Sequence, residues 1–176
     1  MNAALTAAEA IKGSKDAFIS LIRANEQTMY RTARSMLKSD SDTADAIQET
    51  ILKAYKGIRE LREPAFFRTW LVRILINECR QLIRKNSKLV PLTGAIEQTQ
   101  ATSGGLDAKM DMELLLNRLD LEQKEVVVLY YMEDMSVKEI ARMLEISEGT
   151  VKSRLYRARM KLAVMLDIID SKEETQ

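Results

Sequence analysis

Glycine and proline, the two residues that most often interrupt helices, are rare in this chain. Its 176 residues include 6 glycines and 2 prolines, and neither residue type occurs between Gly13 and Gly57. Long runs without either residue favour helices over a β fold rich in turns. No segment shows the sustained alternation of apolar and polar residues that a half-buried strand requires. The chain is therefore predicted to be all-α.

One segment departs from this pattern. Residues 87–105 (SKLVPLTGAIEQTQATSGG) hold three of the six glycines, one proline and five serines or threonines, with two charged side chains. This composition is typical of a flexible linker, and a linker of this length has an end-to-end distance of about 25 Å. We therefore expect two small helical domains, 1–86 and 106–170, joined by the linker 87–105 and followed by an acidic tail, 171–176.

The spacing of apolar residues predicts four helices in each domain. Those of the first domain lie near 6–23, 26–37, 42–59 and 65–86. Those of the second lie near 106–118, 121–133, 136–144 and 148–166. Pro64 stands where the fourth helix should begin, a position that suits proline. The expected N-terminal caps are Ser41 or Asp42, Asp120, Ser136 and Ser147.

Several classes of function are disfavoured by what the sequence lacks. It has no histidine and a single cysteine, Cys79, which excludes Ser-His-Asp and Cys-His catalysis and the common zinc sites that use histidine. No glycine-rich phosphate loop, paired-carboxylate metal site or activated nucleophile emerges, so we expect no catalytic residue, metal or cofactor. No apolar run is long enough to insert into a membrane, and the N-terminus does not resemble a signal peptide. The expected location is the cytoplasm.

The segment 136–162 (SVKEIARMLEISEGTVKSRLYRARMKL) has the spacing of a helix-turn-helix. In its second helix Val151, Leu155, Ala158 and Leu162 fall within about 60° of arc at 100° per residue, which predicts a narrow buried seam. The rest of that helix is polar and basic, as in a recognition helix that enters the major groove. An ordinary amphipathic helix with a solvated basic face is the alternative. The candidate DNA-contacting residues are Lys152, Ser153, Arg154, Tyr156, Arg157 and Arg159.

A basic stripe also runs along the helix expected at 65–86. Arg73, Asn77, Arg80 and Arg84 lie within about 60° of one another, and Trp70 and Phe66 or Phe67 lie near its start. Cations that track a backbone, rings that stack on bases and an amide that reads a base edge are the groups used to bind single-stranded DNA. The alternatives are core filling for Trp70 and solvation for the arginines.

The helix expected at 42–59 has a predicted core seam and a different opposite face. The seam consists of Ala44, Ile47, Ile51, Tyr55 and Ile58. On the other face Leu52 is an apolar residue among acidic and polar ones, which hints at a protein partner with a basic and partly apolar groove. A harmlessly exposed leucine is the alternative. The candidate partner-binding residues are Asp45, Gln48, Glu49 and Leu52.

Three of these segments, in this order around a linker, resemble one family. DAIQETILKAY, FFRTWLVRILINECRQLIRK and LDLEQKEVVVLYYMEDMSVKEIARMLEISEGTVKSRLYRARMKL are similar to a bacterial RNA polymerase sigma factor of the extracytoplasmic-function (ECF) type, within the sigma-70 family. The resemblance implies that the first domain binds the β′ clamp helices of polymerase and the −10 promoter element. It implies that the second domain binds the β flap and the −35 element.

The resemblance also implies roles for individual residues. The acidic face with Leu52 matches the clamp-binding face, and Asn77 matches an asparagine that lines a pocket for a flipped −10 base. The loop Leu61 to Phe66 resembles the loop that selects this base. Lys152, Ser153, Tyr156 and Arg157 match the positions that read the −35 element. The chain departs from the family at Ile51, where phenylalanine is frequent, and in the loop RELREPAF, which has a proline and two glutamates.

The function predicted from the sequence is that of an alternative sigma factor, without enzymatic activity, in a stress or envelope response. Its expected partners are core RNA polymerase, promoter DNA and an anti-sigma factor. The alternative is a stand-alone helix-turn-helix regulator, either a repressor or a response-regulator output domain, which would bind duplex DNA as a dimer. A palindromic footprint would favour that alternative.

Overall fold

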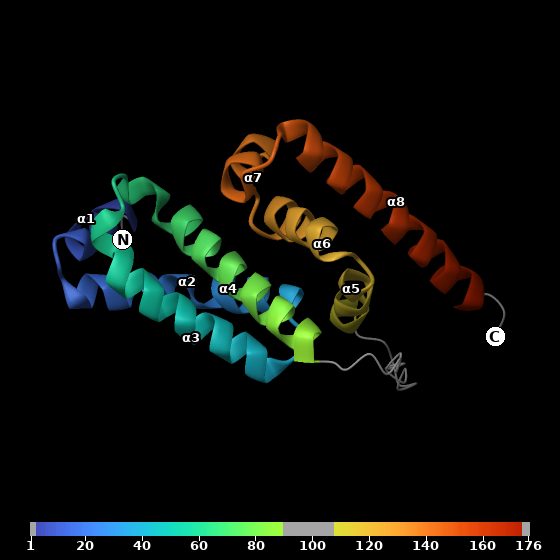
Figure 1. Cartoon of the computed structure of the whole chain (residues 1–176), viewed down its shortest axis with the longest axis horizontal. Helices are drawn as coiled ribbons and strands as arrows, with labels where there is room; N and C mark the ends of the chain where they lie inside the picture. The colour runs from blue at the N-terminus through green and yellow to red at the C-terminus, as the bar shows by residue number, and fades with distance from the viewer. Residues whose placement is uncertain (1–2, 90–107, 174–176) are drawn as a thin grey trace. The chain divides into compact units, whose positions relative to one another are not determined.

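The computed structural model describes residues 3–89 and 108–173, and within these ranges the chain forms helices and no strand (Figure 1). The all-α prediction is confirmed for this part of the chain. The chain divides into two compact units, Met1–Leu89 and Val90–Gln176. Each unit has its own buried apolar residues and is described by itself.

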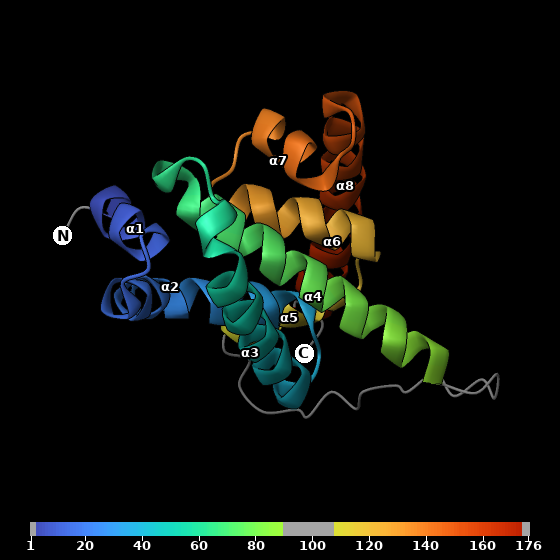
Figure 2. The same ribbon diagram turned by 60° about the vertical axis from the view of Figure 1, so that its left-hand side comes forward.

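Unit 1 is a helical bundle. Its helices are α1 (Ala3–Ile11), α2 (Lys15–Met36), α3 (Asp40–Gly57) and α4 (Phe67–Leu89), with 3-10 turns η1 (Ile58–Glu60) and η2 (Pro64–Phe66) between α3 and α4. Helices α3 and α4 lie side by side, and α2 packs against both of them (Figure 1 and Figure 2). Helix α1 packs on α2 and on the two 3-10 turns. Leu71, Leu75 and Cys79 of α4 are fully buried and belong to the core of this unit.

The predicted break between the first two helices is wrong. It was expected near residues 24–25, but α2 runs unbroken through them and the chain turns at Gly13. Gly13 has a φ of +104°, which favours glycine because other residues are strained there. The Ser14 hydroxyl then accepts a hydrogen bond from the backbone N–H of Ala17 at 3.2 Å and begins α2.

Other helix ends also differ from the prediction. The cap of α3 is Ser39, whose hydroxyl accepts from the backbone N–H of Asp42 at 3.3 Å, rather than Ser41 or Asp42. Pro64 begins η2, and α4 starts three residues later. Helix α4 continues to Leu89, so residues 87–89 are helical and do not belong to a linker. The remainder of the predicted linker, 90–105, lies outside the described residues.

The predicted core seam of α3 is rotated by about one residue along the helix, although Ile58, just after its end, is buried as predicted. The buried side chains are Thr43, Ala46, Thr50 and Ala54, whereas Tyr55 is 49% exposed. The two threonine hydroxyls donate to backbone carbonyl groups one turn earlier, at 2.9 and 2.7 Å, so burial leaves them satisfied. Small residues therefore face α2 and α4, and the larger apolar residues of α3 lie toward the surface.

Unit 2 contains the predicted helix-turn-helix. Its elements are α5 (Ala108–Asn117), α6 (Leu121–Val127), a π-helical turn η3 (Val128–Met132), α7 (Val137–Leu144) and α8 (Glu148–Glu173). Helix α8 packs on α6 and α7, and Val151, Leu155 and Ala158 of its predicted seam are buried. The helix expected at 121–133 changes from α to π geometry at Val128. Helix α8 extends into the predicted acidic tail, as far as Glu173.

The turn between α7 and α8 is held at both of its ends. Glu145 takes the left-handed conformation (φ 57°, ψ 43°), and the backbone N–H groups of Glu145 and Ile146 both donate to the Ala141 carbonyl. Ser147 then begins α8, as predicted, by accepting from the backbone N–H of Thr150 at 3.0 Å. These bonds fix the direction in which α8 leaves the turn.

Helix α7 begins with a capping box. The Ser136 hydroxyl accepts from the backbone N–H of Glu139 at 3.3 Å, and Glu139 Oε2 accepts from the Ser136 hydroxyl and backbone N–H at 2.7 and 2.8 Å. The hydrogen bond from the Ser136 hydroxyl, followed by the bond from its backbone N–H, holds the pKa of the Glu139 carboxyl below its ordinary value. The charged carboxylate is therefore the form that stabilises the start of α7.

We expect Ser136→Ala to lower the free energy of unfolding of unit 2 by about 1 kcal/mol at neutral pH. The stabilisation from Glu139 is complete above the ordinary pKa of a glutamate, and it is lost as the pH falls through the lowered pKa of the folded state. The difference between wild type and Ser136→Ala should therefore shrink on acidification. Denaturant unfolding between about pH 6 and pH 3 measures it. A difference that stays constant over this range would contradict the role of the carboxylate.

None of the helices in the described ranges is long and apolar enough to cross a membrane.

Candidate nucleic-acid interface and partner-binding face

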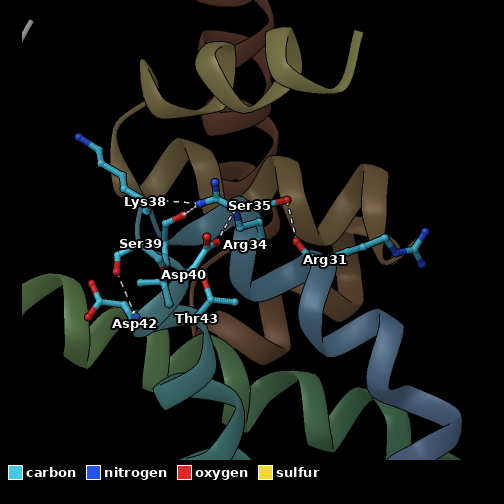
Figure 3. A network of polar contacts seen from close by, with 9 residues as sticks. Arg31, Arg34, Ser35, Lys38, Ser39, Asp40, Asp42 and Thr43 are labelled. Carbon is cyan, nitrogen blue, oxygen red and sulfur yellow. Dashed lines mark hydrogen bonds and ion pairs between the residues drawn. The ribbon is translucent and has the colours of Figure 1, made fainter. Parts of the chain in front are cut away.

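The corner between α2 and α3 is held by Arg34 (Figure 3). Its guanidinium donates to the backbone carbonyl of Lys38 at 3.0 Å and forms an ion pair with Asp40, with Nε and Oδ1 3.4 Å apart. The Ser39 cap lies directly between these two contacts. The first turn of α3 is therefore fixed to the end of α2, and this fixes which side of α3 faces outward.

The outward side of α3 carries an apolar hollow. Its cavity volume is about 400 Å³, and its exposed lining is almost entirely apolar. We call it the α3 hollow; its lining residues are Tyr30, Asp40, Thr43, Ala44, Ile47, Gln48, Ile51 and Leu52. The structure therefore brings together two of the four predicted partner-binding residues, Gln48 and Leu52. Ile51, which the sequence placed in the core, is half-buried and lines the hollow instead.

The other two predicted partner-binding residues lie at a neighbouring, more polar depression. Asp45 and Glu49 are exposed and line it together with Lys53 of α3 and Glu78 of α4. Lys53 Nζ lies 2.6 Å from Glu78 Oε1, and the Glu78 side chain is 8% exposed while that of Lys53 is 45% exposed. This ion pair ties α3 to α4 beneath the acidic edge of the partner-binding face.

The predicted basic stripe lies on α4. Asn77, Arg73 and Arg84 are exposed, and Arg80 is half-buried. Trp70 is half-buried near Phe67, with ring centroids 6.0 Å apart. A Cβ added to Gly57 would lie 3.4 Å from the Trp70 ring, so this ring packs closely against the end of α3.

The aromatic pair that precedes the stripe is divided between surface and core. Phe66, in η2, is 58% exposed, whereas Phe67 is 4% exposed and belongs to the core. The sequence left the choice between the two open. Phe66 is therefore the exposed member of this pair, at the N-terminal end of the stripe.

Helix α8 presents the predicted DNA-contacting face. Lys152, Ser153, Tyr156 and Arg157 are exposed on it, opposite the buried seam. The Arg157 Nε–H donates to the backbone carbonyl of Ser153 at 3.4 Å, and the Ser153 hydroxyl donates to that of Thr150 at 3.0 Å. Both side chains are thus held along the helix near its N-terminal end.

Arg154 and Arg159 differ from the other predicted DNA-contacting residues because each contacts a side chain of another element. The side chain of Arg154 is 14% exposed, and its guanidinium lies 2.7 Å from the carboxylate of Glu122 in α6. The geometry gives it an anchoring role, while its contact with DNA stays a prediction. Arg159 donates from Nε to the Tyr131 hydroxyl at 2.7 Å.

Sequence reasoning missed two aromatic residues of these surfaces. Tyr30 of α2 lines the α3 hollow, and Tyr131 of η3 contacts Arg159. Each comes from an element other than the helix whose face it completes, so helical periodicity within one segment could not find it. Within residues 3–89 and 108–173 no cluster of three or more acidic or cysteine side chains is placed to hold a metal ion.

Comparison with known proteins matches both units. Residues 21–89 match the model of sigma-70 region 2, and residues 109–162 match that of sigma-70 region 4. The chain is 34% identical to the ECF RNA polymerase sigma factor SigM of Mycobacterium tuberculosis, over 97% of this chain and 87% of that protein.

Two solved structures are similar over most of the chain. One is CnrH, a sigma factor of Cupriavidus metallidurans, in complex with the cytosolic domain of CnrY; it has 29% identity and a TM-score of 0.73, over 94% of this chain and 97% of that one. The other is the sigma factor RpoE of Bartonella quintana in complex with the anti-sigma factor NepR; it has 26% identity and a TM-score of 0.71, over 88% of this chain and 99% of that one. The chain belongs to the ECF family of RNA polymerase sigma factors.

Proposed function

We propose that this ECF sigma factor binds core RNA polymerase through α3 and directs it to promoters with separate −10 and −35 elements. The observation that carries the proposal is the arrangement of unit 1, in which α3, with its apolar hollow and acidic edge, packs beside α4, the helix that carries the basic stripe. One helix can therefore hold a protein while its neighbour holds DNA. A stand-alone regulator would need the helix-turn-helix of unit 2 and has no use for this pair of surfaces.

In the proposed complex, the β′ clamp helices occupy the α3 hollow. An apolar side chain of the partner fits against Ile47, Ile51 and Leu52, and basic residues beside it meet Asp45 and Glu49. Burial of apolar area supplies affinity, while the carboxylates fix the orientation of the partner and exclude acidic competitors.

Strand opening follows from differential binding. The arginines on α4 track the backbone of the non-template strand, while Phe66 and Asn77 offer a ring for stacking and an amide that can read a base edge once pairing is broken. A protein that binds the extruded base better than the paired one shifts the equilibrium toward the open form. This role requires binding and positioning, and no bond is made or broken by the chain.

In unit 2, the exposed face of α8 reads the −35 element in the major groove while other surfaces of the unit contact the β flap. We assign Ser153 and Tyr156 to base edges and Lys152 and Arg157 to phosphates, since all four side chains are exposed on this face. The buried seam and the bond between Arg154 and Glu122 hold α8 in place for this contact.

An anti-sigma factor is the expected inhibitory partner. CnrH and RpoE were each solved with a second protein bound, the cytosolic domain of CnrY and the anti-sigma factor NepR. By analogy, a partner of this kind covers the polymerase-binding surfaces of this chain in the cytoplasm until a stress or envelope signal releases it. Competition between this partner and core polymerase is the simplest form of control.

Reconstitution tests the proposal. The purified chain, mixed with core RNA polymerase, should co-elute with it and should retain a subset of fragments from a genomic library. Those fragments should support transcription from fixed start sites that core polymerase alone does not use. A chain that fails to bind core polymerase, and instead protects a palindromic site as a dimer, would establish the stand-alone regulator.

Asn77→Ala is expected to reduce open-complex formation on duplex promoters by about tenfold, because a base contact made in the open form is lost. The loss should be smaller on a template whose −10 region is already mismatched, since opening is then not required. Permanganate reactivity of promoter thymines measures opening, and co-elution checks that core binding is unchanged. Equal losses on the two templates would contradict a role for Asn77 in strand capture.

A further inference from the structure

Arg159 is held by two tyrosines of the π-helical turn η3. Its Nε lies 2.7 Å from the Tyr131 hydroxyl oxygen. Its guanidinium carbon lies 5.7 Å from the centre of the Tyr131 ring and 5.8 Å from that of Tyr130. The two rings meet edge to face, with centroids 4.9 Å apart and an interplanar angle of 79°. A long and flexible cation is therefore fixed by one hydrogen bond and two ring contacts.

The nature of these contacts distinguishes Arg159 from Arg154 on the same helix. Arg154 lies against the carboxylate of Glu122, which neutralises its charge. Tyrosine hydroxyls and ring faces carry no net charge, so they hold Arg159 and leave its positive charge in place. The bond to Tyr131 uses Nε and leaves the terminal amino groups of the guanidinium to face a ligand.

The position of Arg159 on α8 indicates which ligand this is. It lies seven residues after Lys152 and three after Tyr156, and these spacings place all three side chains on one side of a helix. Tyr156 is 64% exposed and Tyr131 is 56% exposed, so the cation sits at the surface, at the edge of the predicted DNA-contacting face. A guanidinium held beside a groove-reading helix is suited to a backbone phosphate.

We propose that Arg159 binds one phosphate of duplex DNA and that Tyr131 is a positioning residue for this contact. This inference rests on the proposed reading of duplex DNA by unit 2. An arginine that is already ordered loses less side-chain entropy when it binds. The turn η3 thereby becomes part of the DNA-binding surface, although it lies outside the helix-turn-helix.

The experiment uses the full chain assembled with core RNA polymerase. The probe is a duplex promoter fragment that the wild-type complex selects from random-sequence DNA, together with the same fragment scrambled in its −35 half. Affinity is measured as a function of NaCl concentration for the wild type and for R159A, Y131F and the double variant. K161A is the matched control, because Lys161 is a cation on the same helix that lies 3.7 Å from the carboxylate of Asp120 in the direction of α6.

R159A should lower affinity about tenfold and should reduce the slope of log affinity against log salt by about one, as expected for the loss of one phosphate contact. Y131F should lower affinity about threefold in the wild type and should have no further effect in R159A, because its effect passes through Arg159. K161A should leave the affinity within about twofold of the wild type and the slope unchanged, because Lys161 faces the Asp120 carboxylate and surface pairs of this kind contribute little.

Two results would overturn the inference while leaving the proposed function intact. One is a salt slope in R159A equal to that of the wild type. The other is an effect of Y131F that persists undiminished in R159A, which would give Tyr131 a purely structural role in η3. If scrambling the −35 half does not weaken wild-type binding, the reading of duplex DNA by unit 2 is itself wrong, and the inference falls with it.

Discussion

Leu52→Glu is expected to lower the affinity of the chain for core RNA polymerase by about 100-fold, or about 2.7 kcal/mol, the size typical of a central interface residue. Leu52 is 44% exposed and lines the α3 hollow. A glutamate at this position removes apolar contact area. Its carboxylate would also be buried against polymerase without a cation to neutralise it. Competition for core polymerase against a labelled wild-type chain measures the loss.

Ile19→Glu is the matched control. Ile19 lies on α2 and is 47% exposed, so the substitution makes a similar chemical change at similar exposure, away from the lining of the α3 hollow. It should leave core binding within twofold of the wild type, as is usual for surface changes outside an interface. Both variants should unfold at nearly the wild-type denaturant concentration. If the two variants bind core polymerase equally well, the docking face lies elsewhere.

Lys53→Met is expected to lower the free energy of unfolding of unit 1 by about 2 kcal/mol. Removing one partner of a buried ion pair typically costs about 3 to 5 kcal/mol, because the remaining charge stays buried without compensation. The expected loss is smaller than that range because the Lys53 side chain is 45% exposed. Water can therefore enter where the ammonium group was and partly solvate the Glu78 carboxylate. Asp45, Glu49 and Lys85 line the same depression as Glu78, so without Lys53 three carboxylates share it with one remaining cation.

The double variant Lys53→Met with Glu78→Leu separates the charge from the packing. It removes both ions, so no charge remains buried, and it should be more stable than Lys53→Met alone by about 1 kcal/mol or more. Denaturant unfolding of the wild type, the two single variants and the double variant completes the cycle. A double variant less stable than Lys53→Met would show that the cost lies in lost packing rather than in the unpaired carboxylate.

The helix-turn-helix could be predicted closely because its signals are local. Ser136 and Ser147 are caps that act within four residues, and the seam of Val151, Leu155 and Ala158 follows from helical spacing alone. The seam of α3 could not be predicted in this way, because which face becomes buried depends on how near α2 and α4 approach. Close packing selects Thr43, Ala46, Thr50 and Ala54 for the inside, although hydrophobicity alone favours the isoleucines.

The break before α2 was present in the sequence as Gly13 followed by Ser14, which is a common end and a common start for helices. The apolar pattern continues on both sides of it, so hydrophobic periodicity alone does not reveal this break. The contacts of individual arginines could not be predicted, for a different reason. Whether Arg154 meets DNA, Glu122 or water depends on an acidic residue of α6 that lies 32 positions earlier in the chain. Pattern within one helix carries no information about such a pair.

The close-packed inner face of α3 also bears on how sigma factors of this kind can diverge. Because small residues and threonines form its contact with the bundle, the large apolar residues that line the hollow, which are half-buried or exposed, contribute less to folding than fully buried ones would. Exchanges among them change what the hollow fits at small cost in stability. With polymerase and an inhibitor docking at the α3 hollow, as proposed above, their affinities could be retuned by single substitutions, so a duplicated gene could acquire a new inhibitor without first acquiring a new fold.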